Sequence, residues 1–466
     1  MDSYIRVRIK GTLETLSALH VSSGEEGEYK DKENESRHYA QLCLNVDEKP
    51  FIPASTIRGV LRGFVEQHDQ EMANRLFGCS NDDENRVSGK LRFYDAPLLS
   101  LNLSDDLLSK HHKDQQKNYN NQGVINFRIK LDSILGVAEE NKLFASEYVP
   151  MGSTFEVELE ADNTNESDLK DILGLLECFD GTEQATLGKG LSQGQGRVQW
   201  KCEEITYLDL EQIANWLNDS NSELKYTVLK GIEPTQVELK KPLKKIEIQL
   251  NFSAPFLVND AYLVKEKNED NSQEENEKIH DLEFSRLPNG KPIIPASSLR
   301  GVLRGQCQKI LNTKLSNPPT LDKLFGTTEQ RSLLWITDAV GNSKENHEQM
   351  FNAIDRFTGG AKEGALYQVL AADNKTLKLT ISLEERQALE EWEKGLLLLV
   401  ARDALEGDLA CGWGKARGFG AFKATLFDPD KQSPITTWKD LIEKVGIGNA
   451  TNWLDAFDKL TPSQTP

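Results

Sequence analysis

Two segments of the sequence combine a hydroxyl group and two arginines at a spacing suited to binding phosphate. Each has the pattern Ser-x-x-Arg-Gly-x-x-Arg, formed by Ser55, Arg58 and Arg62 in the first segment and by Ser297, Arg300 and Arg304 in the second. On a helix, residues four positions apart share one face, so each arginine pair points the same way. A helix N-terminus with hydroxyl and guanidinium groups is suited to phosphate. An ordinary surface helix is the alternative interpretation.

Glycine interrupts both predicted helices. Gly59 and Gly301 directly follow the first arginine of each segment. Glycine in a helix interior costs about 1 kcal/mol relative to alanine. We therefore expect something to pass close to each helix at this glycine, where a side chain would obstruct it.

Two glycine-rich segments offer further basic side chains. They span 188–196 and 412–420 and carry Lys189 in the first and Lys415 and Arg417 in the second. A helix is predicted before each segment and a strand after it, whereas a dinucleotide-binding loop lies between a strand and a following helix, and the Gly-Lys-Ser/Thr of a P-loop is missing. We predict loops that a backbone can approach closely, with the basic side chains available for phosphate. A simple tight turn is the alternative.

These segments recur because the chain is duplicated. Residues 50–63 (PFIPASTIRGVLRG) are repeated as residues 292–305 (PIIPASSLRGVLRG). Leu-Phe-Gly, a strand ending in Asp-Ala and a segment around Leu131-Asp132 or Ile354-Asp355 recur between these repeats and the glycine-rich loops, in the same order. The period is too long for a solenoid, so the sequence indicates two tandem copies of one domain.

Each copy needs strands and helices that bring these segments together. Hydrophobic periodicity predicts the order strand, helix, strand, strand, helix, strand. The predicted elements of the first copy are 4–9, a helix capped by Ser55, 91–94, 154–159, 168–179 and 197–200. Those of the second are 245–252, a helix capped by Ser297, 333–336, 376–383, 384–404 and 421–426. This order predicts an α+β fold of two tandem ferredoxin-like (RRM-like) domains with long insertions.

The predicted domains are 1–235 and 236–466, joined by the Pro- and Lys-containing stretch 231–242. The tail of the second domain is predicted to contain one helix (438–445) and then to fray. Three acidic runs, 25–35, 82–84 and 266–277, are predicted to be solvated loops because they contain few apolar residues.

Composition points to a cytoplasmic protein with no membrane partner. The sequence has no run of eighteen apolar residues and no signal-peptide pattern, and its six cysteines form no CxxC pair. The net charge of −19 argues against nucleic acid. The repeated motifs are nonetheless locally basic, so the global charge says little about their surface.

The order of these motifs resembles the RAMP superfamily of CRISPR proteins. The resemblance rests on Pro-x-Ile-Pro-x-Ser-x-x-Arg-Gly-x-x-Arg, Leu-Phe-Gly, Asp-Ala, Ile-Asp-Arg-x-Thr-Gly and the paired Gly-x-Gly, once per half, with 354–361 the most specific stretch. Among its members, the chain is most similar to backbone subunits of type III effector complexes, fused as in the type III-D variety. The resemblance implies a ferredoxin-like fold that grips guide RNA, with a thumb-like insertion that kinks guide and target.

The resemblance also implies a catalytic carboxylate. Target-cleaving members carry an aspartate about a dozen residues before the Pro-x-Ile-Pro motif, where this chain has Asp281. Asp260 is a second candidate whose position fits less well. The corresponding window of the first copy, 37–40, contains no acid. His38 and His280 fall in these windows as well, and loop histidines are more often surface residues than catalysts, although either could act as a general acid or bind phosphate.

The sequence therefore predicts a two-domain CRISPR subunit that binds guide RNA and cleaves complementary target RNA with Asp281. A divalent metal ion, Mg²⁺, would be held by Asp281 together with RNA phosphates. The expected partners are guide RNA, target RNA, further backbone subunits and a large polymerase-like subunit. Three alternatives remain open: a non-catalytic RNA-binding scaffold, a guide-processing RNase of the same superfamily, and an unrelated ferredoxin-like binding module.

Overall fold

Two compact units make up the chain. The computed structural model describes residues 3–30, 36–67, 69–79, 87–102, 123–131, 138–181, 185–218, 223–236, 244–259, 280–287, 290–327, 329–342, 345–373, 376–384, 387–428 and 433–461. Contacts assign 1–103, 116–126 and 145–240 to the first unit and 104–115, 127–144 and 241–466 to the second. Among the described residues, no helix is both long and apolar enough to cross a membrane.

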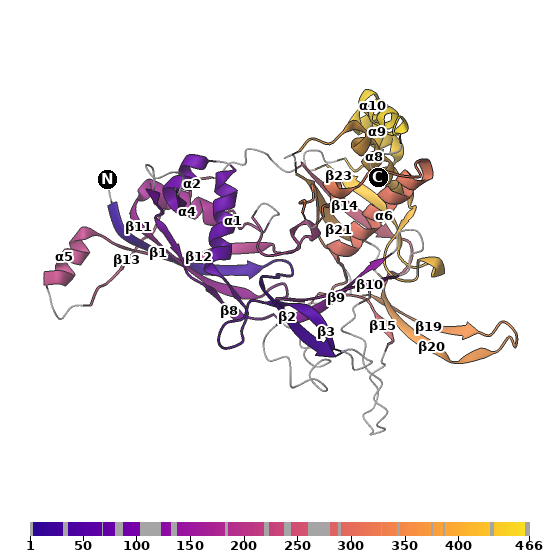
Figure 1. The fold of residues 1–466 in the computed structure, drawn as a ribbon, viewed down its shortest axis with the longest axis horizontal. Helices are drawn as coiled ribbons and strands as arrows, with labels where there is room; N and C mark the ends of the chain where they lie inside the picture. The colour runs from indigo at the N-terminus through magenta and orange to yellow at the C-terminus, as the bar shows by residue number, and fades with distance from the viewer. Residues whose placement is uncertain are drawn as a thin grey trace, which may run out of the picture. The chain divides into compact units, whose positions relative to one another are not determined.

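The first unit has a ferredoxin-like core, and Figure 1 shows its helices on one face of the sheet. The core elements are β1 (Ser3–Thr15), α1 (Ala54–Glu66), β7 (Leu91–Phe93), β11 (Thr154–Asn165), α4 (Glu166–Leu176) and β12 (Val198–Leu208). The strands are hydrogen-bonded in the order β12-β1-β11-β7, and every pair is antiparallel. The first and third core strands therefore lie in the centre, as the predicted βαββαβ order requires.

The second unit repeats this topology. Its core elements are β14 (Lys244–Phe252), α6 (Ala296–Lys314), β17 (Leu334–Ile336), β21 (Thr376–Leu383), α8 (Glu391–Glu406) and β23 (Ala421–Phe427). The sheet order β23-β14-β21-β17 matches that of the first unit strand for strand, again with antiparallel pairing throughout. The α+β fold of two tandem ferredoxin-like domains predicted from the sequence is confirmed.

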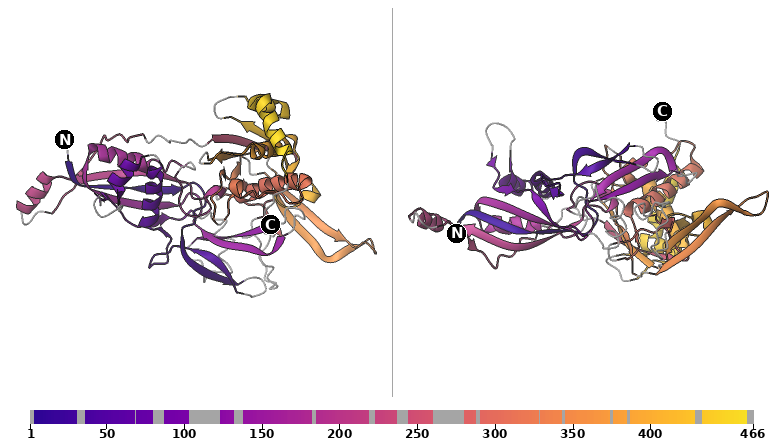
Figure 2. Two further views of the ribbon diagram at one scale, coloured as in Figure 1. Left: turned by 45° about the horizontal axis from the view of Figure 1, so that its top comes forward. Right: turned by 90° about the horizontal axis from the view of Figure 1, so that it is seen from below.

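The insertions of the two units also correspond. In the first copy they are β2 (Ser22–Lys30), β3 (Ser36–Leu42), β4 (Phe51–Ile52), β8 (Ala96–Ser100), β9 (Val124–Leu131) and β10 (Ala138–Tyr148), although contacts assign most of β9 and β10 to the second unit. In the second they are β15 (Leu282–Glu283), β16 (Ile293–Ile294), β18 (Ala339–Gly341), β19 (Asn346–Ile354) and β20 (Ala361–Ala372). We call the hairpin of β19 and β20 the arm; both views of Figure 2 show it extending as a long two-stranded ribbon.

One parallel pairing is common to both sets of insertions. The strand before the Pro-x-Ile-Pro segment runs parallel to the second strand of the long hairpin, with Ala40 opposite Ser146 in one unit and Leu282 opposite Val369 in the other. Since everything else in these sheets is local and antiparallel, this contact joins the loop before each arginine-bearing helix to the base of its hairpin.

The remaining elements are short or peripheral. They are α2 (Gln70–Phe77), β5 (Gly78–Cys79), β6 (Val87–Ser88), η1 (Leu191–Gln193), α5 (Leu210–Asn218), β13 (Thr227–Val228), α7 (Asp322–Phe325), β22 (Leu409–Ala410), η3 (Lys415–Arg417), α9 (Trp438–Val445) and α10 (Ile447–Asp458). α10 packs on α8, where Gly395 lies against the backbone of Trp453. A Cβ at Gly395 would lie 2.3 Å from the Trp453 carbonyl oxygen, so only glycine allows this approach.

The prediction that Ser55 and Ser297 cap the arginine-bearing helices is wrong. The helices start at Ala54 and Ala296, one residue before these serines, so the serines lie inside the helices. The N-cap residues are Pro53 and Pro295, and neither provides a side-chain cap. Instead, the aspartate of each Asp-Ala motif accepts the first helical N–H group. Ala54 N donates to Asp95 Oδ1 at 2.8 Å, and Ala296 N donates to Asp338 Oδ1 at 2.7 Å. A tertiary contact thus replaces the local cap.

Other differences from the sequence prediction occur where local signals are weak. The tail was expected to fray after 445, yet α10 forms there although its sequence contains Gly, Asn and Thr, because Ala450, Trp453 and Phe457 pack in the cores around α8. α8 begins at Glu391, seven positions later than expected, with a Glu390–Glu393 capping box. The acidic stretch from Glu25 belongs to strand β2 and is not a loop, although its side chains are solvated as predicted.

The aspartate caps yield a first prediction. In Asp338→Ala, the N–H of Ala296 loses its acceptor, and loss of a cap costs about 1 kcal/mol. We expect amide exchange in the first turn of α6 to become about fivefold faster, with α1 unaffected, because 1.4 kcal/mol corresponds to a factor of ten. Asp338→Asn keeps an acceptor oxygen and should exchange almost as the unmodified protein does. Equal exchange in all three proteins, measured by mass spectrometry, would contradict the cap.

Candidate nucleic-acid interface

The first arginine of each repeated helix packs inward, against the Leu-Phe-Gly turn. Arg58 Nη2 donates to the Phe77 carbonyl oxygen at 2.8 Å, and its guanidinium lies 5.8 Å from the Phe77 ring centre. Arg300 lies 5.7 Å from the equivalent ring of Phe325. Burial, together with the nearby charge of Arg304, lowers the pKa of Arg300 to about 10. These two arginines therefore hold the turn against the helix, a role that the sequence did not indicate.

The second arginine of each helix lies closer to solvent. Arg62 Nε donates to Glu66 Oε1 at 2.6 Å, and Arg304 lies 3.6 Å from Asp322 with about half of its side chain exposed. Ser55 is exposed and Ser297 is half-buried. Because exposed ion pairs contribute little to stability, both second arginines can exchange their carboxylate for a phosphate at small cost. They remain the phosphate-binding candidates of these helices.

Beside these arginines, glycines leave the backbone of each helix uncovered by side chains. Gly59 and Gly63 in α1, and Gly301 and Gly305 in α6, are four positions apart and so share a face. No atom of the described chain lies within 4 Å of the point where a Cβ would stand at any of the four, close neighbours in the helix aside. Packing within the protein therefore does not explain these glycines. The open strip fits an outside molecule that approaches the helix closely.

The glycine-rich loops, in contrast, are shaped by the protein's own backbone. All eight glycines have positive φ, between 71° and 79° in the first loop and between 73° and 83° in the second. A Cβ at Gly188 would lie 2.2 Å from the His20 carbonyl oxygen, and one at Gly412 the same distance from that of Leu257. The adjacent amides close the contact, from Lys189 to His20 at 2.9 Å and from Trp413 to Leu257 at 2.7 Å. The close approach predicted from the sequence is made by the loop after the first core strand.

The basic side chains of these loops point away from that contact. Lys189, Lys415 and Arg417 are all exposed. They do not occupy equivalent positions, since Trp413 stands where the first copy has Lys189, and Gln193 stands where the second has Arg417. The two loops thus share a backbone shape and differ in the side chains that they offer to a ligand.

Arg417 covers an aromatic cluster that sequence reasoning missed. Its guanidinium lies 4.9 Å from the ring centre of Trp413, 5.6 Å from Phe351 and 5.9 Å from Tyr367. Phe351 and Tyr367 stack at 5.3 Å, and Trp413 meets both of them edge-on. The cluster joins the base of the arm to the glycine-rich loop. The Gly-Trp-Gly sequence was its only local signal, because the other two rings come from an arm whose pairing the sequence did not reveal.

Asp281 lies at the base of this arm, where it is bound to β20. Its backbone N–H donates to the Gln368 carbonyl oxygen at 2.8 Å, and the Gln368 N–H donates back to Asp281 Oδ2 at 2.7 Å. Gln368 directly follows Tyr367 of the aromatic cluster. The fold therefore brings Asp281, the arm and the loop of Arg417 into one chain of contacts. Arg300 and Arg304 belong to a different element, α6.

His280 fixes the neighbouring position. It is buried, contrary to the expectation for a loop histidine, with Nδ1 3.4 Å from Glu283 Oε1 and Nε2 3.5 Å from Glu348 Oε1. Glu283 is bound in turn by Arg286 at 2.8 Å. Glu348 lies on β19, so the buried His280 packs between the segment of Asp281 and that strand, although its Nε2 forms no hydrogen bond with the described residues. His38, in the first copy, is exposed as expected.

The first copy has a different residue at the position of Asp281. Tyr39 stands there, the same number of residues before Ala54 as Asp281 stands before Ala296, and its ring packs against Gly27. A carboxylate does lie nearby on β10: Glu147, which is 2% exposed and accepts the Leu42 N–H at 3.2 Å. Burial raises the pKa of Glu147, only partly offset by that hydrogen bond. A group so enclosed cannot reach a ligand.

The described residues supply few ligands for the predicted Mg²⁺ ion. Among the described residues, no group of three or more His, Cys, Asp or Glu side chains could hold an ion. Glu283 and Glu348 face His280, so Asp281 is the carboxylate that remains for a ligand at this place. Asp260, the second catalytic candidate, lies outside the described residues. Asp281 fits a cation only if RNA phosphates complete the coordination of the ion, as they commonly do for Mg²⁺.

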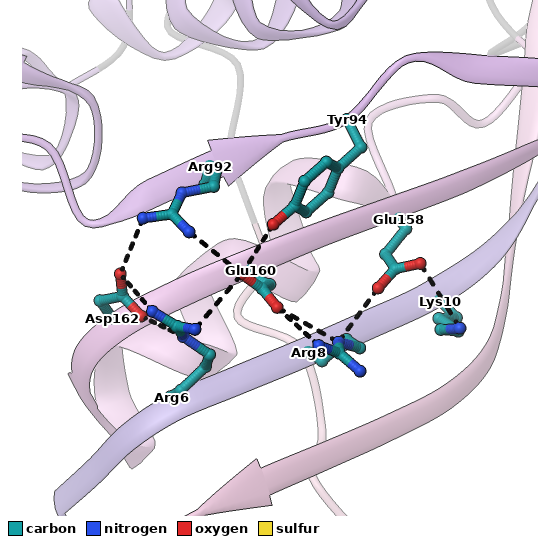
Figure 3. Close-up of polar contacts among 8 residues, drawn as sticks. All are labelled: Arg6, Arg8, Lys10, Arg92, Tyr94, Glu158, Glu160 and Asp162. Carbon is teal, nitrogen blue, oxygen red and sulfur yellow. Dashed lines mark hydrogen bonds and ion pairs between the residues drawn. The ribbon is translucent and has the colours of Figure 1, made fainter.

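A second possible RNA surface, the open face of the first-unit sheet, is occupied by its own charges. Figure 3 shows Arg6, Arg8 and Lys10 of β1 and Arg92 of β7 meeting the carboxylates of β11, Glu158, Glu160 and Asp162. The cations alternate along β1 with the buried Val7 and Ile9, which places them on the face opposite the core.

Glu160 is the centre of this network. It is 3% exposed and receives Arg8 Nη2 and the Tyr94 hydroxyl at 2.8 Å. Burial would raise its pKa, yet the hydrogen bonds from Arg8 and Tyr94 and the charge of Arg6 together hold the pKa below its ordinary value. Because the carboxylates already neutralise these cations, the sheet face is a poor phosphate surface. The helix strips and the glycine-rich loops are better candidates.

Comparison with protein families shows to which family the chain belongs. The family model of the RAMP superfamily matches residues 12–199 and again residues 231–423, which together make up most of the chain. The chain belongs to the RAMP superfamily. Each match includes the arginine-bearing helix and the glycine-rich loop of one copy. No curated protein matches the chain.

RAMP membership establishes the broad role. The chain is a two-copy, CRISPR-associated RAMP protein, and membership implies RNA binding within a multi-subunit complex of CRISPR defence. The two family matches leave out residues 1–11, 200–230 and the residues after 423. α5, β13, α9 and α10 lie in these unmatched stretches, together with parts of the core strands β1, β12 and β23.

The bare glycine strip yields a second prediction. Gly301→Ala and Gly305→Ala should each stabilise α6 by up to about 1 kcal/mol, since alanine is the better helix former. The added methyl groups would also obstruct a backbone passing along the strip, so we expect RNA affinity to fall at least tenfold. Thr313→Ala, at an exposed site on another side of α6, should raise helix stability without changing RNA affinity. Unchanged RNA binding in both glycine variants would remove the strip from the interface.

Glu147 gives a pH-dependent prediction. Its raised pKa means that folding favours the protonated form, so its contribution to stability is fully present below its unfolded pKa of about 4.5. That contribution is lost as pH rises through the folded pKa. Glu147→Gln keeps an acceptor for Leu42 N–H without a charge, so this variant should be more stable than the unmodified protein at pH 7 and equally stable near pH 4. Thermal unfolding across this range tests it; a constant difference would show that titration of Glu147 is not the cause.

Proposed function

We propose that this chain is a backbone subunit of a type III CRISPR effector complex, fused from two copies as in type III-D-like systems. It binds guide RNA with both domains and cleaves complementary target RNA with the second. The position of Asp281 carries the proposal: a carboxylate at the base of a long arm, in the window that the target-cleaving relatives use. The complete duplication of core, loop and helix supports guide binding by both copies.

Guide binding would use the sugar–phosphate backbone and not the bases. The helix strips offer bare backbone beside Arg62 and Arg304, and the glycine-rich loops offer Lys189, Lys415 and Arg417. Such contacts neutralise phosphates and position RNA without reading its sequence. This suits a protein that must accept guides of any sequence.

The arm is built to meet the RNA bases. At its tip, Asp355 Oδ1 accepts the N–H groups of Phe357 and Thr358, both at 2.8 Å, which preforms the turn. These hydrogen bonds lower the pKa of Asp355 and keep it charged. The side chain of Phe357 is 99% exposed. An apolar ring held on a rigid turn can stack on or wedge between bases, because every base presents a π-face.

Cleavage would take place where the kinked target passes the base of the arm. Asp281 Oδ2 is bound to Gln368, so Oδ1 is the atom that faces a ligand; it can orient the attacking oxygen or accept its proton. Mg²⁺ held by Asp281 and RNA phosphates would supply neutralisation of the developing phosphoryl charge. His280 and its two glutamates keep the Asp281 segment against the arm. The first copy, with Tyr39 at this position, would bind RNA without cutting it.

A non-catalytic scaffold is the second candidate, and one observation favours it. The hydrogen bond from Gln368 to Asp281 Oδ2 gives the carboxylate a structural role, closing the pairing between β15 and β20. A scaffold would need Asp281 for this contact alone. The two candidates therefore differ in whether the negative charge of Asp281 matters beyond its ability to accept a hydrogen bond.

Asp281→Asn separates these two roles. Asparagine still accepts the Gln368 N–H but carries no charge, so the assembled complex should lose one cut from the ladder of target fragments while guide binding persists. The Gln368 amide should stay protected from exchange in Asp281→Asn and lose protection in Asp281→Ala. Tyr39→Ala serves as the matched control in the first copy and should leave the ladder unchanged. Normal cleavage by Asp281→Asn would refute catalysis at this residue and favour the scaffold.

A further inference from the structure

α5 is a helix without a partner inside its own unit. It follows the last core strand of the first unit and projects beyond the edge strand β13, as Figures 1 and 2 show. None of its nine residues, all of them described, is buried. It also lies in the stretch between the two family matches.

The helix carries an apolar stripe of regular spacing. Leu210, Ile213, Ala214 and Leu217 stand at positions i, i+3, i+4 and i+7, which places them on one face. Leu210 is 74% exposed and Leu217 is 69% exposed. Leu224 and Val228, on the segment that follows the helix, are exposed as well. This spacing is the pattern of helices that bind in a groove of another protein.

Intrinsic stability does not explain why α5 is helical. An isolated helix of fewer than about twelve residues is marginal in water. α5 has no fully buried residue, and only Gln212 and Ile213 are half-buried. What holds it is local: Asp209 and Gln212 form a reciprocal cap at 2.8 and 2.7 Å, and Gln212 also bonds to Thr227 of β13. These contacts fix the start of the helix and leave the apolar stripe exposed. Such an arrangement preforms the helix for a partner that buries the stripe.

The charged residues around the apolar stripe indicate which class of molecule can bind it. Glu211 is the only charged residue of α5, and Asp209 precedes it. The adjoining segments expose Glu203, Glu204 and Glu223 as well as Lys201 and Lys225, so acids outnumber bases around the stripe. Phosphate backbones and anionic lipid surfaces would be repelled by this acidic surround. A protein groove bordered by lysine or arginine would be attracted, and its apolar floor would take the leucines.

We propose that α5 is a docking helix that binds an apolar groove with a basic rim on another protein subunit of the effector complex. The interaction is separate from RNA binding and cleavage, because α5 contains none of the residues assigned to either. Leu217 and Leu210 are the anchors in the groove, and Glu211 and Asp209 pair with its rim.

The test compares two substitutions that add the same charge on opposite faces of the helix. Leu217→Asp places a carboxylate in the stripe, whereas Asn215→Asp places one on the far side; both positions are exposed, so neither change removes packing. The full-length chain and each variant are titrated with the other protein subunits of the complex, purified singly. We expect one subunit to bind the unmodified chain, Leu217→Asp to weaken that binding at least tenfold, and Asn215→Asp to change it less than twofold.

Charge complementarity has its own readout. Glu211→Lys should slow association with the same subunit and flatten the dependence of the rate on salt, since rim charges act mainly on encounter. Guide-RNA binding and target cleavage should be unchanged in all three variants, which keeps this proposal distinct from the function proposed above. If cleavage by Asp281 failed its own test, the docking result would stand unaffected.

Several results would overturn the docking helix. One is equal binding of every subunit to the unmodified chain and to Leu217→Asp. A second is sedimentation showing that the unmodified chain self-associates and Leu217→Asp does not, which would make a second copy the occupant. A third is loss of guide RNA, or of anionic vesicles of phosphatidylserine, specifically from Leu217→Asp. Any of these assigns the stripe to something other than a basic-rimmed protein groove.

Discussion

The hydrogen bond from the first helical N–H to a distant aspartate underlies both domains. Asp95 and Asp338 each follow the second core strand and accept from Ala54 and Ala296, the first residues of α1 and α6. A negative charge at a helix N-terminus is favourable, and here it also joins the helix to the insertion that continues from the strand. The helix that starts at this contact carries both the arginines and the bare glycines. Both copies preserve the contact together with the Pro-Ala-Ser and Asp-Ala residues around it.

The two domains share this fold and differ in the side chains at several equivalent positions. The backbone contacts of the glycine-rich loops are nearly identical, whereas Lys189 and Trp413 exchange a cation for an aromatic ring at the same position. At the base of the long hairpin, one domain has Tyr39 and a buried Glu147, while the other has Asp281 and His280 bound to the arm. Of these two equivalent positions, only the one in the second domain has a carboxylate that is not fully buried.

The positions of the acidic residues explain how a chain with a net charge of −19 can belong to an RNA-binding family. On the sheet face, carboxylates such as Glu160 are engaged with arginines, and along α5 they surround an apolar stripe. The helix strips and glycine-rich loops carry exposed cations and no acid within the motifs. Charge therefore divides the described surface into basic regions and regions where carboxylates are paired or predominate. A single net charge hides that division because phosphate binding depends on local fields.

The sequence by itself determined the duplication, the βαββαβ order, the α+β class and the identity of the repeated motifs, because periodicity and repetition are local properties of the chain. It also singled out Asp281 through its distance from the Pro-x-Ile-Pro segment. Only the tertiary structure decided that Ser55 and Ser297 do not cap their helices, that Arg58 and Arg300 pack against Phe77 and Phe325, that α10 forms, and that Asp281 binds Gln368. Each of these depends on residues far apart in sequence, whose pairing energy no local pattern contains. Long-range contact outweighed local propensity at all four places.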